Sequence, residues 1–209
     1  MFDPNGTYYM REIVPDILIW SWFSAPHGYE FNGHLLLDPT GNICIDPVPP
    51  EEEELATIIN KGVSQILLTN RNHSRAANLI RTRTGAQTLI HPADADHARS
   101  QATMLDGEIT VGETFGPLEV IDVAGKSQGE VALYWRKRRI LIVGDAVIGH
   151  PTGRCGLLPE RVIDDPILLR RNVATLMALD FDILLFGDGQ SILSDANDRL
   201  GELAKEFTD

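Results

Sequence analysis

The sequence predicts an α+β fold in which two β-sheets pack face to face and helices cover their outer surfaces. Strand-like segments outnumber helix-like segments, which favours a sheet-on-sheet core. The two halves of the chain also have a similar layout, because each begins with hairpin-like strands and ends in alternating strands and helices. A hydrophobic fraction of 43% is sufficient to build such a core. We expect residues 1–209 to form one domain.

The first strands are expected in a hairpin. The first 29 residues are mixed in character and rich in aromatic side chains, and we assign no strand to them. Residues 31–37 and 43–46 carry strand signals, and the turn-rich segment 38–42 separates them.

Alternating helices and strands follow the hairpin. Prolines and glutamates around residues 49–54 favour a helix start, and Gly62 favours its end. A buried strand is expected at 65–69, a second helix from Ser74 to Gly85, and another strand at 87–91. The residues of the second helix expected to face inward are Ala76, Ala77, Leu79 and Ile80.

The second half repeats this layout. β-branched and aromatic residues predict strands at 108–111, 118–123, 130–135, 140–143 and 181–186. A helix is expected to start at Pro166, with an apolar stripe that includes Leu169 and Val173. Ser194 is the expected cap of a final helix.

Composition limits the classes of function. No apolar run approaches the 18 or so residues of a membrane-spanning helix, and the N-terminus lacks the features of a secretory signal. Cys44 and Cys155 are far apart, so we expect no disulfide framework and a cytoplasmic location. The formal net charge of -12 disfavours nucleic-acid binding. The oligomeric state stays open.

Five segments, in order, resemble motifs of the metallo-β-lactamase superfamily. The first segment ends its hairpin in an Ile-Asp pair, and the fourth has a Gly-Asp pair after a strand, as the family does. The third segment has Gly-Lys-Ser where the family has Gly-His-Ser, and the fifth has Gly-Asp-Gly where the family has Gly-His-Gly. The second segment is the one in which the family carries a Thr-His-x-His-x-Asp-His motif. The segments are 31–47, 66–75, 125–127, 143–146 and 187–189. The resemblance implies a four-layer αββα sandwich and a hydrolase ancestry with ester, thioester, lactam or phosphoester substrates.

In that family the motifs supply ligands for two zinc or iron ions. Of the seven corresponding positions, only Asp145 is unchanged, and Asp188 is the one replacement that is a good ligand. The other positions hold amides, a hydroxyl and cations, namely Asn70, Asn72, Ser74, Arg75 and Lys126. We therefore expect the usual metal pair to be absent and no cofactor to be required. The alternative is a single divalent metal held by Asp145 and Asp188.

Charge substitution is the hypothesis that these replacements favour. Arg75 and Lys126 would fill the space of the metals and pair with Asp145 and Asp188, since a buried carboxylate needs a cation nearby. The resulting ion cluster is either purely structural or a binding site for a small anion or polar molecule. His73 lies inside the altered motif, and it and Asp145 are the candidates for a catalytic base.

Two further segments carry histidines. The Gly-rich loop that follows Asp145 contains His150, which we place in the pocket or at its rim. Asp96 and His97 read as a solvated helix start, with a local metal cluster as the weaker alternative.

Two functions therefore remain open at this point. One is hydrolysis of an ester-like or phosphoester substrate without the usual two-metal mechanism. The other is non-catalytic binding of a small polar or anionic ligand, or of a partner protein. Neither requires a membrane or a nucleic acid.

Overall fold

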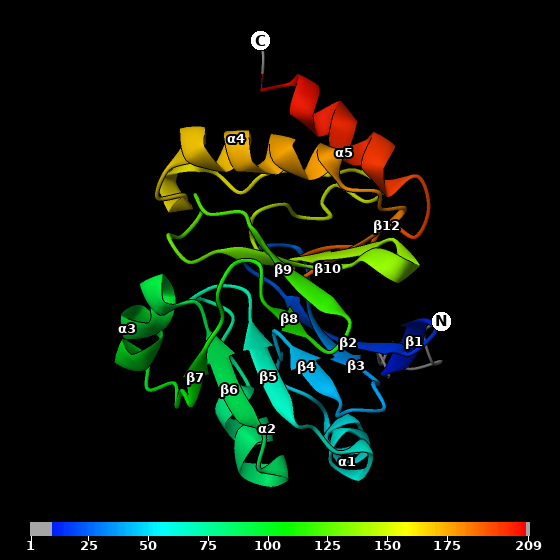
Figure 1. The fold of residues 1–209 in the computed structure, drawn as a ribbon, viewed down its shortest axis with the longest axis vertical. Coiled ribbons are helices and arrows are strands. Elements are labelled where there is room, and N and C mark those ends of the chain that lie inside the picture. Colours follow the sequence, from blue (N-terminus) through cyan, green and yellow to red (C-terminus); the bar gives the residue numbers. More distant parts are fainter. Residues whose placement is uncertain (1–9, 208–209) are drawn as a thin grey trace.

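Two β-sheets pack face to face, and helices lie outside both of them (Figure 1). The computed structural model describes residues 10–207, so the predicted domain 1–209 extends past the described residues at both ends. The larger sheet has seven strands in the order β1-β2-β3-β4-β5-β6-β7, and the smaller has five in the order β12-β11-β10-β9-β8. The layers follow the sequence α, β, β, α, which confirms the predicted fold class.

The larger sheet is antiparallel from β1 to β4 and parallel from β4 to β7. Its strands are β1 (Arg11–Val14), β2 (Ile17–Ser24), β3 (Tyr29–Leu36), β4 (Ile43–Ile45), β5 (Gln65–Leu68), β6 (Gln87–Ile90) and β7 (Gly107–Glu108). The helices on its outer side are α1 (Glu52–Lys61), α2 (Ala77–Thr84) and α3 (Pro92–Ser100).

The smaller sheet is antiparallel except for the parallel pair of β11 and β12. Its strands are β8 (Thr114–Phe115), β9 (Leu118–Asp122), β10 (Val131–Trp135), β11 (Ile140–Val143) and β12 (Ile183–Phe186). The helices α4 (Pro166–Thr175) and α5 (Ala196–Lys205) cover it. Three short 3-10 helices, η1 (Arg136–Arg138), η2 (Glu160–Val162) and η3 (Leu176–Ala178), complete the elements.

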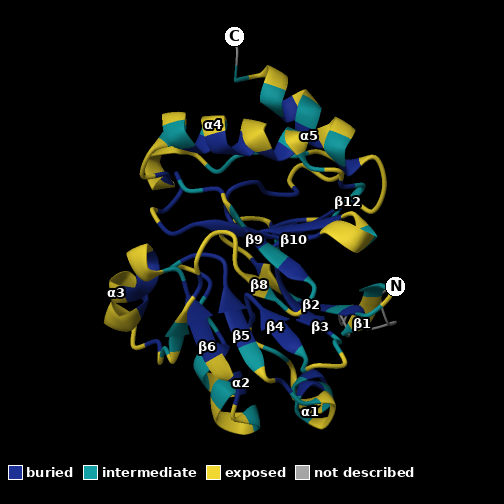
Figure 2. Cartoon of the chain, viewed as in Figure 1, coloured by how far each residue is buried: buried dark blue, intermediate teal, exposed yellow. Residues whose placement is uncertain are grey.

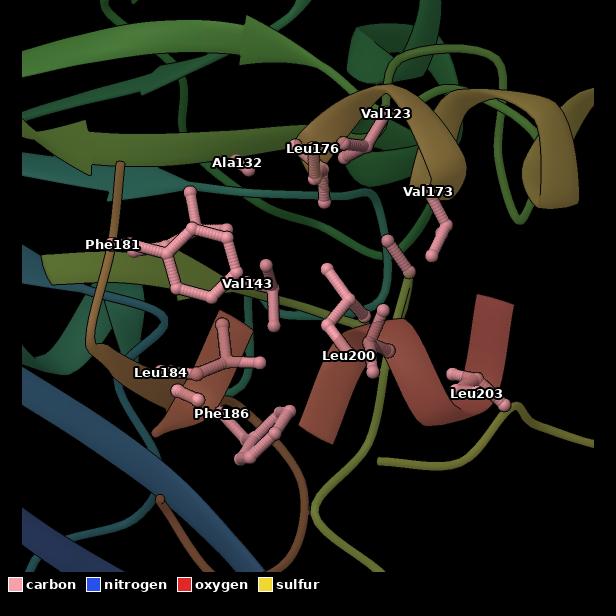
Figure 3. Close-up of a cluster of buried hydrophobic side chains, with 14 of the residues drawn as sticks. Val123, Ala132, Val143, Val173, Leu176, Phe181, Leu184, Phe186, Leu200 and Leu203 are labelled. Atoms are coloured by element: carbon pink, nitrogen blue, oxygen red, sulfur yellow. The ribbon is translucent and has the colours of Figure 1, made fainter. Parts of the chain in front are cut away.

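Three hydrophobic clusters hold the four layers together. One lies between the sheets and includes Leu36 and Leu185, and a second joins the larger sheet to its helices around Leu35. The third joins the smaller sheet to α4 and α5, and it includes Val143, Leu184 and Leu200 (Figure 3). The central strands are accordingly buried, while the edge strands β1, β7 and β8 and the outer faces of the helices are more exposed (Figure 2). Burial on both faces explains why most strands read as continuous apolar runs.

Several predicted elements are confirmed. The hairpin of β3 and β4 is antiparallel, with His34 opposite Ile45. α1 begins with a capping box between Glu51 and Glu54, and Gly62 ends it in a backbone conformation with φ of 75°.

Other predictions were wrong. Residues 1–29 were assigned no strand, but β1 and β2 lie there. The second helix starts at Ala77 instead of Ser74, because residues 70–76 form the turn that carries the site, and Leu79 is 41% exposed instead of facing inward. The final helix is capped at Asp195 and not at Ser194.

Among residues 10–207, no helix is long and apolar enough to cross a membrane. Both cysteines are free: Cys44 is buried and Cys155 is half-buried. The predicted absence of a disulfide between them therefore holds.

The topology gathers distant segments at one edge of the sandwich. The turns that follow β4, β5, β11 and β12 meet there, as does the turn between β9 and β10. Asn32 of β3 fastens the two sheets at this edge, because its side-chain amide donates to the carbonyls of Phe186 at 2.9 Å and Gly189 at 2.8 Å. The residues at the seven metal-ligand positions of the motifs all lie on these turns.

Candidate functional site

His73 stands at the centre of a buried ion cluster. Its Nδ1 lies 2.9 Å from Oδ2 of Asp46, and its Nε2 lies 3.1 Å from Oδ1 of Asp145. Asp46 is fixed in turn, since it accepts hydrogen bonds from the backbone N–H of Thr69 at 2.8 Å and from the Thr69 hydroxyl at 2.5 Å. The imidazole is fully buried. Both ring nitrogens therefore face carboxylates, an arrangement that suits an imidazolium with two N–H donors.

Lys126 lies against the second oxygen of the same carboxylate. Its Nζ is 2.5 Å from Oδ2 of Asp145 and donates to Oδ1 of Asn72 at 2.8 Å. The side chains of Lys126 and Asp145 are only 6% and 7% exposed. Asp145 thus has one cation on each carboxylate oxygen.

Arg75 provides the third cation. Its Nη2 lies 3.2 Å from Oδ1 of Asp188, and its guanidinium carbon lies 4.3 Å from the centre of the Phe31 ring. Nη1 of Arg75 is buried and has no hydrogen-bond partner among the protein atoms described. Arg75 therefore neutralises Asp188 and keeps one donor unused.

Glu130 lies beneath this cluster. Its Oε1 accepts hydrogen bonds from the backbone of Asp145 at 2.8 Å, the backbone of Ala146 at 3.2 Å and the Asn70 amide at 3.2 Å. Oε2 of Glu130 is buried without a partner among residues 10–207. A protonated carboxyl suits such a place better than a carboxylate, because an unpaired buried charge is costly.

The pKa values follow from burial and neighbouring charges. Burial and Arg75 disfavour the charged imidazole, but Asp46 and Asp145 outweigh both and raise the pKa of His73 to about 10. Burial opposes ionisation of Asp145, yet His73 and Lys126 overcome it and hold the pKa of Asp145 well below its usual range.

The two other carboxyl groups shift in the opposite direction. Burial, reinforced by Asp145, raises the pKa of Glu130 to about 8. Burial and then Asp145 raise the pKa of Asp188 to about 6, because they outweigh His73 and Arg75. These shifts favour a protonated His73 beside an ionised Asp145, and a protonated Glu130 beneath them, at neutral pH.

Metal-donor side chains come together once within the described part of the chain. The ligand atoms of His73, Asp145 and Asp188 all lie within 4.8 Å of one another. Each of the three is already paired with an oppositely charged side chain, so a metal would have to displace those partners. The amide oxygens of Asn70 and Asn72 are engaged as well, by the backbone of Asn72 and by Lys126 respectively.

The sequence-predicted site residues fall into two groups. The pairs of Lys126 with Asp145 and of Arg75 with Asp188 form as the charge-substitution hypothesis describes. The structure brings the predicted residues of the first group into or beside the ion cluster, namely Asn70, Asn72, His73, Ser74, Arg75, Lys126, Asp145 and Asp188. Ser74 is half-buried in the turn between His73 and Arg75.

His150 forms the second group and lies outside the cluster. Its ring centre is 5.0 Å from that of Tyr29. This ring pair lines two hollows. The first, which we call the cleft, has a volume of about 380 Å³ and lies between the turn at 25–28 and the loop at 148–162. The second, which we call the crevice, has a volume of about 490 Å³ and lies between β1–β3 and the loop at 189–193.

Asp96 and His97 take no part in the ion cluster, and their side chains form hydrogen bonds within α3 and with Gln101, which follows it. Both are exposed within α3, which begins earlier, at Pro92. The reading of these two residues as a helix start was therefore wrong, although they are solvated as expected. Asp94 of the same helix is buried and accepts hydrogen bonds from the backbone of Arg71 at 2.9 Å and the Ser127 hydroxyl at 2.6 Å. It joins the two turns that carry Asn72 and Lys126.

Sequence reasoning missed the roles of Asp46, Thr69 and Glu130. Asp46 has a φ of 48°, a conformation that is uncommon outside glycine, and it directly follows a strand. Glu130 was visible as an acidic residue at the start of the apolar run at 131–135. A charged residue in such a position signals a specific buried partner.

Solved structures support the same architecture. A metallo-β-lactamase from Pontibacter korlensis superposes with a TM-score of 0.78 at 17% identity, over 97% of this chain and 100% of that chain. The metallo-β-lactamase family protein TTHA1429 from Thermus thermophilus gives 0.71 at 17% identity, over 94% and 80%. TTHA1623, solved in a di-iron-bound form, gives 0.67 at 22% identity, over 89% and 97%.

These identities are low, and the superpositions establish the fold alone. No curated protein matches the sequence. A family model described as the metallo-beta-lactamase superfamily matches residues 10–207. With the αββα layers and the five motifs at one edge, this match shows that the chain belongs to the metallo-β-lactamase superfamily.

Proposed function

We propose that this chain is a metal-independent member of the superfamily that binds a small polar or anionic molecule at the edge of the sandwich. The observation that carries the proposal is the pairing of every site carboxylate with a protein cation. Lys126 and His73 hold Asp145, and Arg75 holds Asp188. Both carboxylates at the family's metal-ligand positions, the retained Asp145 and the Asp188 that replaces a histidine, are thus neutralised by the polypeptide itself.

Electrostatics favour this reading over the two-metal mechanism. Two unit charges about 4 Å apart interact by roughly 4 kcal/mol at an effective dielectric near 20. A divalent ion doubles that repulsion, and Lys126, Arg75 and protonated His73 each contribute to it. The two-metal mechanism generates its nucleophile from metal-bound water. The donor set here does not fit a metal pair, so we derive no hydrolytic step through one.

Metal content tests the proposal directly. The protein is purified without chelators from cells supplied with zinc and iron, and its metals are quantified by mass spectrometry. We expect close to zero equivalents per chain. A matched variant in which Asn70, Asn72 and Lys126 all become histidine adds three imidazole donors and removes one cation, so it should retain more metal. One or more equivalents in the natural chain, lost in Asp145→Asn, would overturn the proposal.

A single-metal hydrolase is the second candidate. The convergence of His73, Asp145 and Asp188 within 4.8 Å favours it, because three protein donors are the usual number at a catalytic zinc. It requires Lys126 to leave Asp145 and His73 to lose a proton. Turnover of ester, thioester or phosphodiester substrates that depends on added zinc and vanishes in Asp145→Ala would support this candidate over the first.

We also propose a cytoplasmic location and no nucleic-acid partner. Free Cys44 and Cys155 are compatible with a reducing compartment, and the net charge of -12 opposes contact with polyphosphate. Fractionation of cells that express a tagged chain tests the location. Retention of the chain on a DNA or RNA column at low salt would contradict the proposal that it has no nucleic-acid partner.

A further inference from the structure

The crevice is the larger of the two hollows and lies beside the ion cluster. One wall is formed by residues of β1, β2 and β3, and the other consists of the loops at 149–152 and 189–193. Asp188 directly precedes the second loop, so the crevice opens next to the cluster without including its charged side chains. Its volume of about 490 Å³ is within the range of small-molecule sites.

The floor of the crevice is held in place by hydrogen bonds. Asn32 is 2% exposed and donates both amide hydrogens to the backbone carbonyls of Phe186 and Gly189. The Ser21 hydroxyl donates to Oδ1 of Asn32 at 2.7 Å, which leaves the Ser21 oxygen available as an acceptor. A ligand would therefore meet a polar group whose orientation is already fixed, which lowers the entropic cost of binding.

The remaining lining combines neutral hydrogen-bonding groups with the apolar side chains of Ile13, Ile19, Trp20 and Leu193. Thr152, Gln190 and Ser191 come from the two loops and supply hydroxyl and amide groups that both donate and accept. The rings of Tyr29 and His150 close one end of the crevice, with their planes 35° apart. An aromatic face beside several hydroxyl and amide groups suits a ligand with apolar C–H faces and hydroxyl edges.

The charge of the lining is balanced. Apart from the imidazole of His150, it contains one basic side chain, Arg11, and one acidic side chain, Glu30. An anion would gain little from such a lining, and the net charge of -12 would repel it. A cation would lack the surplus of carboxylates that it needs.

From these features we infer that the crevice binds a neutral polyhydroxylated molecule, of the size of a mono- or disaccharide. This inference rests on the proposed function and narrows it, because it selects a neutral ligand over an anionic one. The ion cluster then holds the turn that precedes the loop at 189–193 and does not contact the ligand itself.

Ligand-observed NMR titration with named sugars tests the inference. The probes are glucose, galactose, mannose, maltose and sucrose, with glucuronate as the charged comparator. We expect saturable binding of at least one neutral sugar and weaker binding of glucuronate. Gln190→Ala and Ser21→Ala should each weaken binding about three- to tenfold, the loss that corresponds to one hydrogen bond. Gln87→Ala, an exposed glutamine on β6, is the matched control and should bind as the natural chain does.

Three results would overturn the inference: no binding of any neutral sugar, tighter binding of glucuronate, or full binding in both crevice variants. Thermal unfolding of each variant verifies that it is folded. Metal content is measured on the same samples. A metal-free chain that binds none of the sugars refutes the crevice assignment alone, whereas a metal-loaded chain refutes the proposed function whatever the sugars do.

Discussion

Replacing Lys126 with methionine tests the ion cluster most directly. The change removes one charge and keeps an unbranched side chain of similar length. The lost ammonium lies 2.5 Å from Asp145, and the two side chains are 6% and 7% exposed, so solvent screens the pair weakly. Removing one partner of a buried pair costs about 3–5 kcal/mol. We expect about 3 kcal/mol, because His73 still donates to the other oxygen of Asp145.

For a chain of this length, about 3 kcal/mol corresponds to a fall in Tm of roughly 6–12 °C. Guanidinium and thermal unfolding in the presence of EDTA measure the loss without interference from metals. Lys137→Met, at an exposed lysine of η1, is the matched control. Adding Asp145→Asn to Lys126→Met should recover part of the loss, since the unpaired charge is then gone. If Lys126→Met stays within about 1 kcal/mol of the control, the cluster does not depend on its lysine and the reasoning fails.

Three further predictions concern the same edge. The pKa of His73 is raised to about 10 from an unfolded value near 6.5, so its stabilising contribution is complete below pH 6.5 and is lost as pH rises through 10. The free energy of unfolding should therefore differ less between pH 7 and pH 9 in His73→Gln than in the natural chain. Gly144→Ala should lower the free energy of unfolding by about 1–3 kcal/mol, since its Cβ would lie 2.2 Å from Oγ1 of Thr69. Gly107→Ala is the control: its nearest contact would be 3.3 Å, so it should shift the unfolding midpoint less than Gly144→Ala does. Asp94→Ala removes a buried acceptor shared by two turns, so proteolysis of these turns should accelerate; an unchanged cleavage pattern would contradict that role.

The sequence predicted the elements whose boundaries are marked by specific residues. α1 has an acidic first turn and a glycine stop, and the hairpin of β3 and β4 has a turn-rich linker. β2 was missed because Ile17–Ser24 lacks a regular polar alternation, although the turn residues Pro15 and Asp16 before it and Pro26 and Gly28 after it were usable signals. Trp20 from this strand is buried, and its indole N–H donates to the carbonyl of Val48 at 2.9 Å. Such a long-range contact is invisible to local patterns.

α3 was underestimated for a different reason. Its buried residues are Asp94, Ala95 and Ala98, and alanines give only a weak apolar stripe. Its proline at the first helical position was a usable signal, because proline is favoured there.

The candidate site was predictable where motifs fixed the positions of charged residues. Lys126, Arg75, Asp145 and Asp188 lie in four separate turns, and their pairing follows from the rule that buried charges need partners. The burial of His73 could not be foreseen, because its position in the motif gave no indication of Asp46 on the other side of the ring.

The chain order of the cluster has a consequence for how the molecule assembles. Asp46 and His73 come from turns of the larger sheet, whereas Lys126 and Asp145 come from turns of the smaller one. Two ion pairs join the halves, His73 with Asp145 and Arg75 with Asp188, so these two pairs exist only when the sheets are packed together. Sheets that met in another alignment would leave these charges without partners, so the cluster favours the one correct way for the two halves to meet.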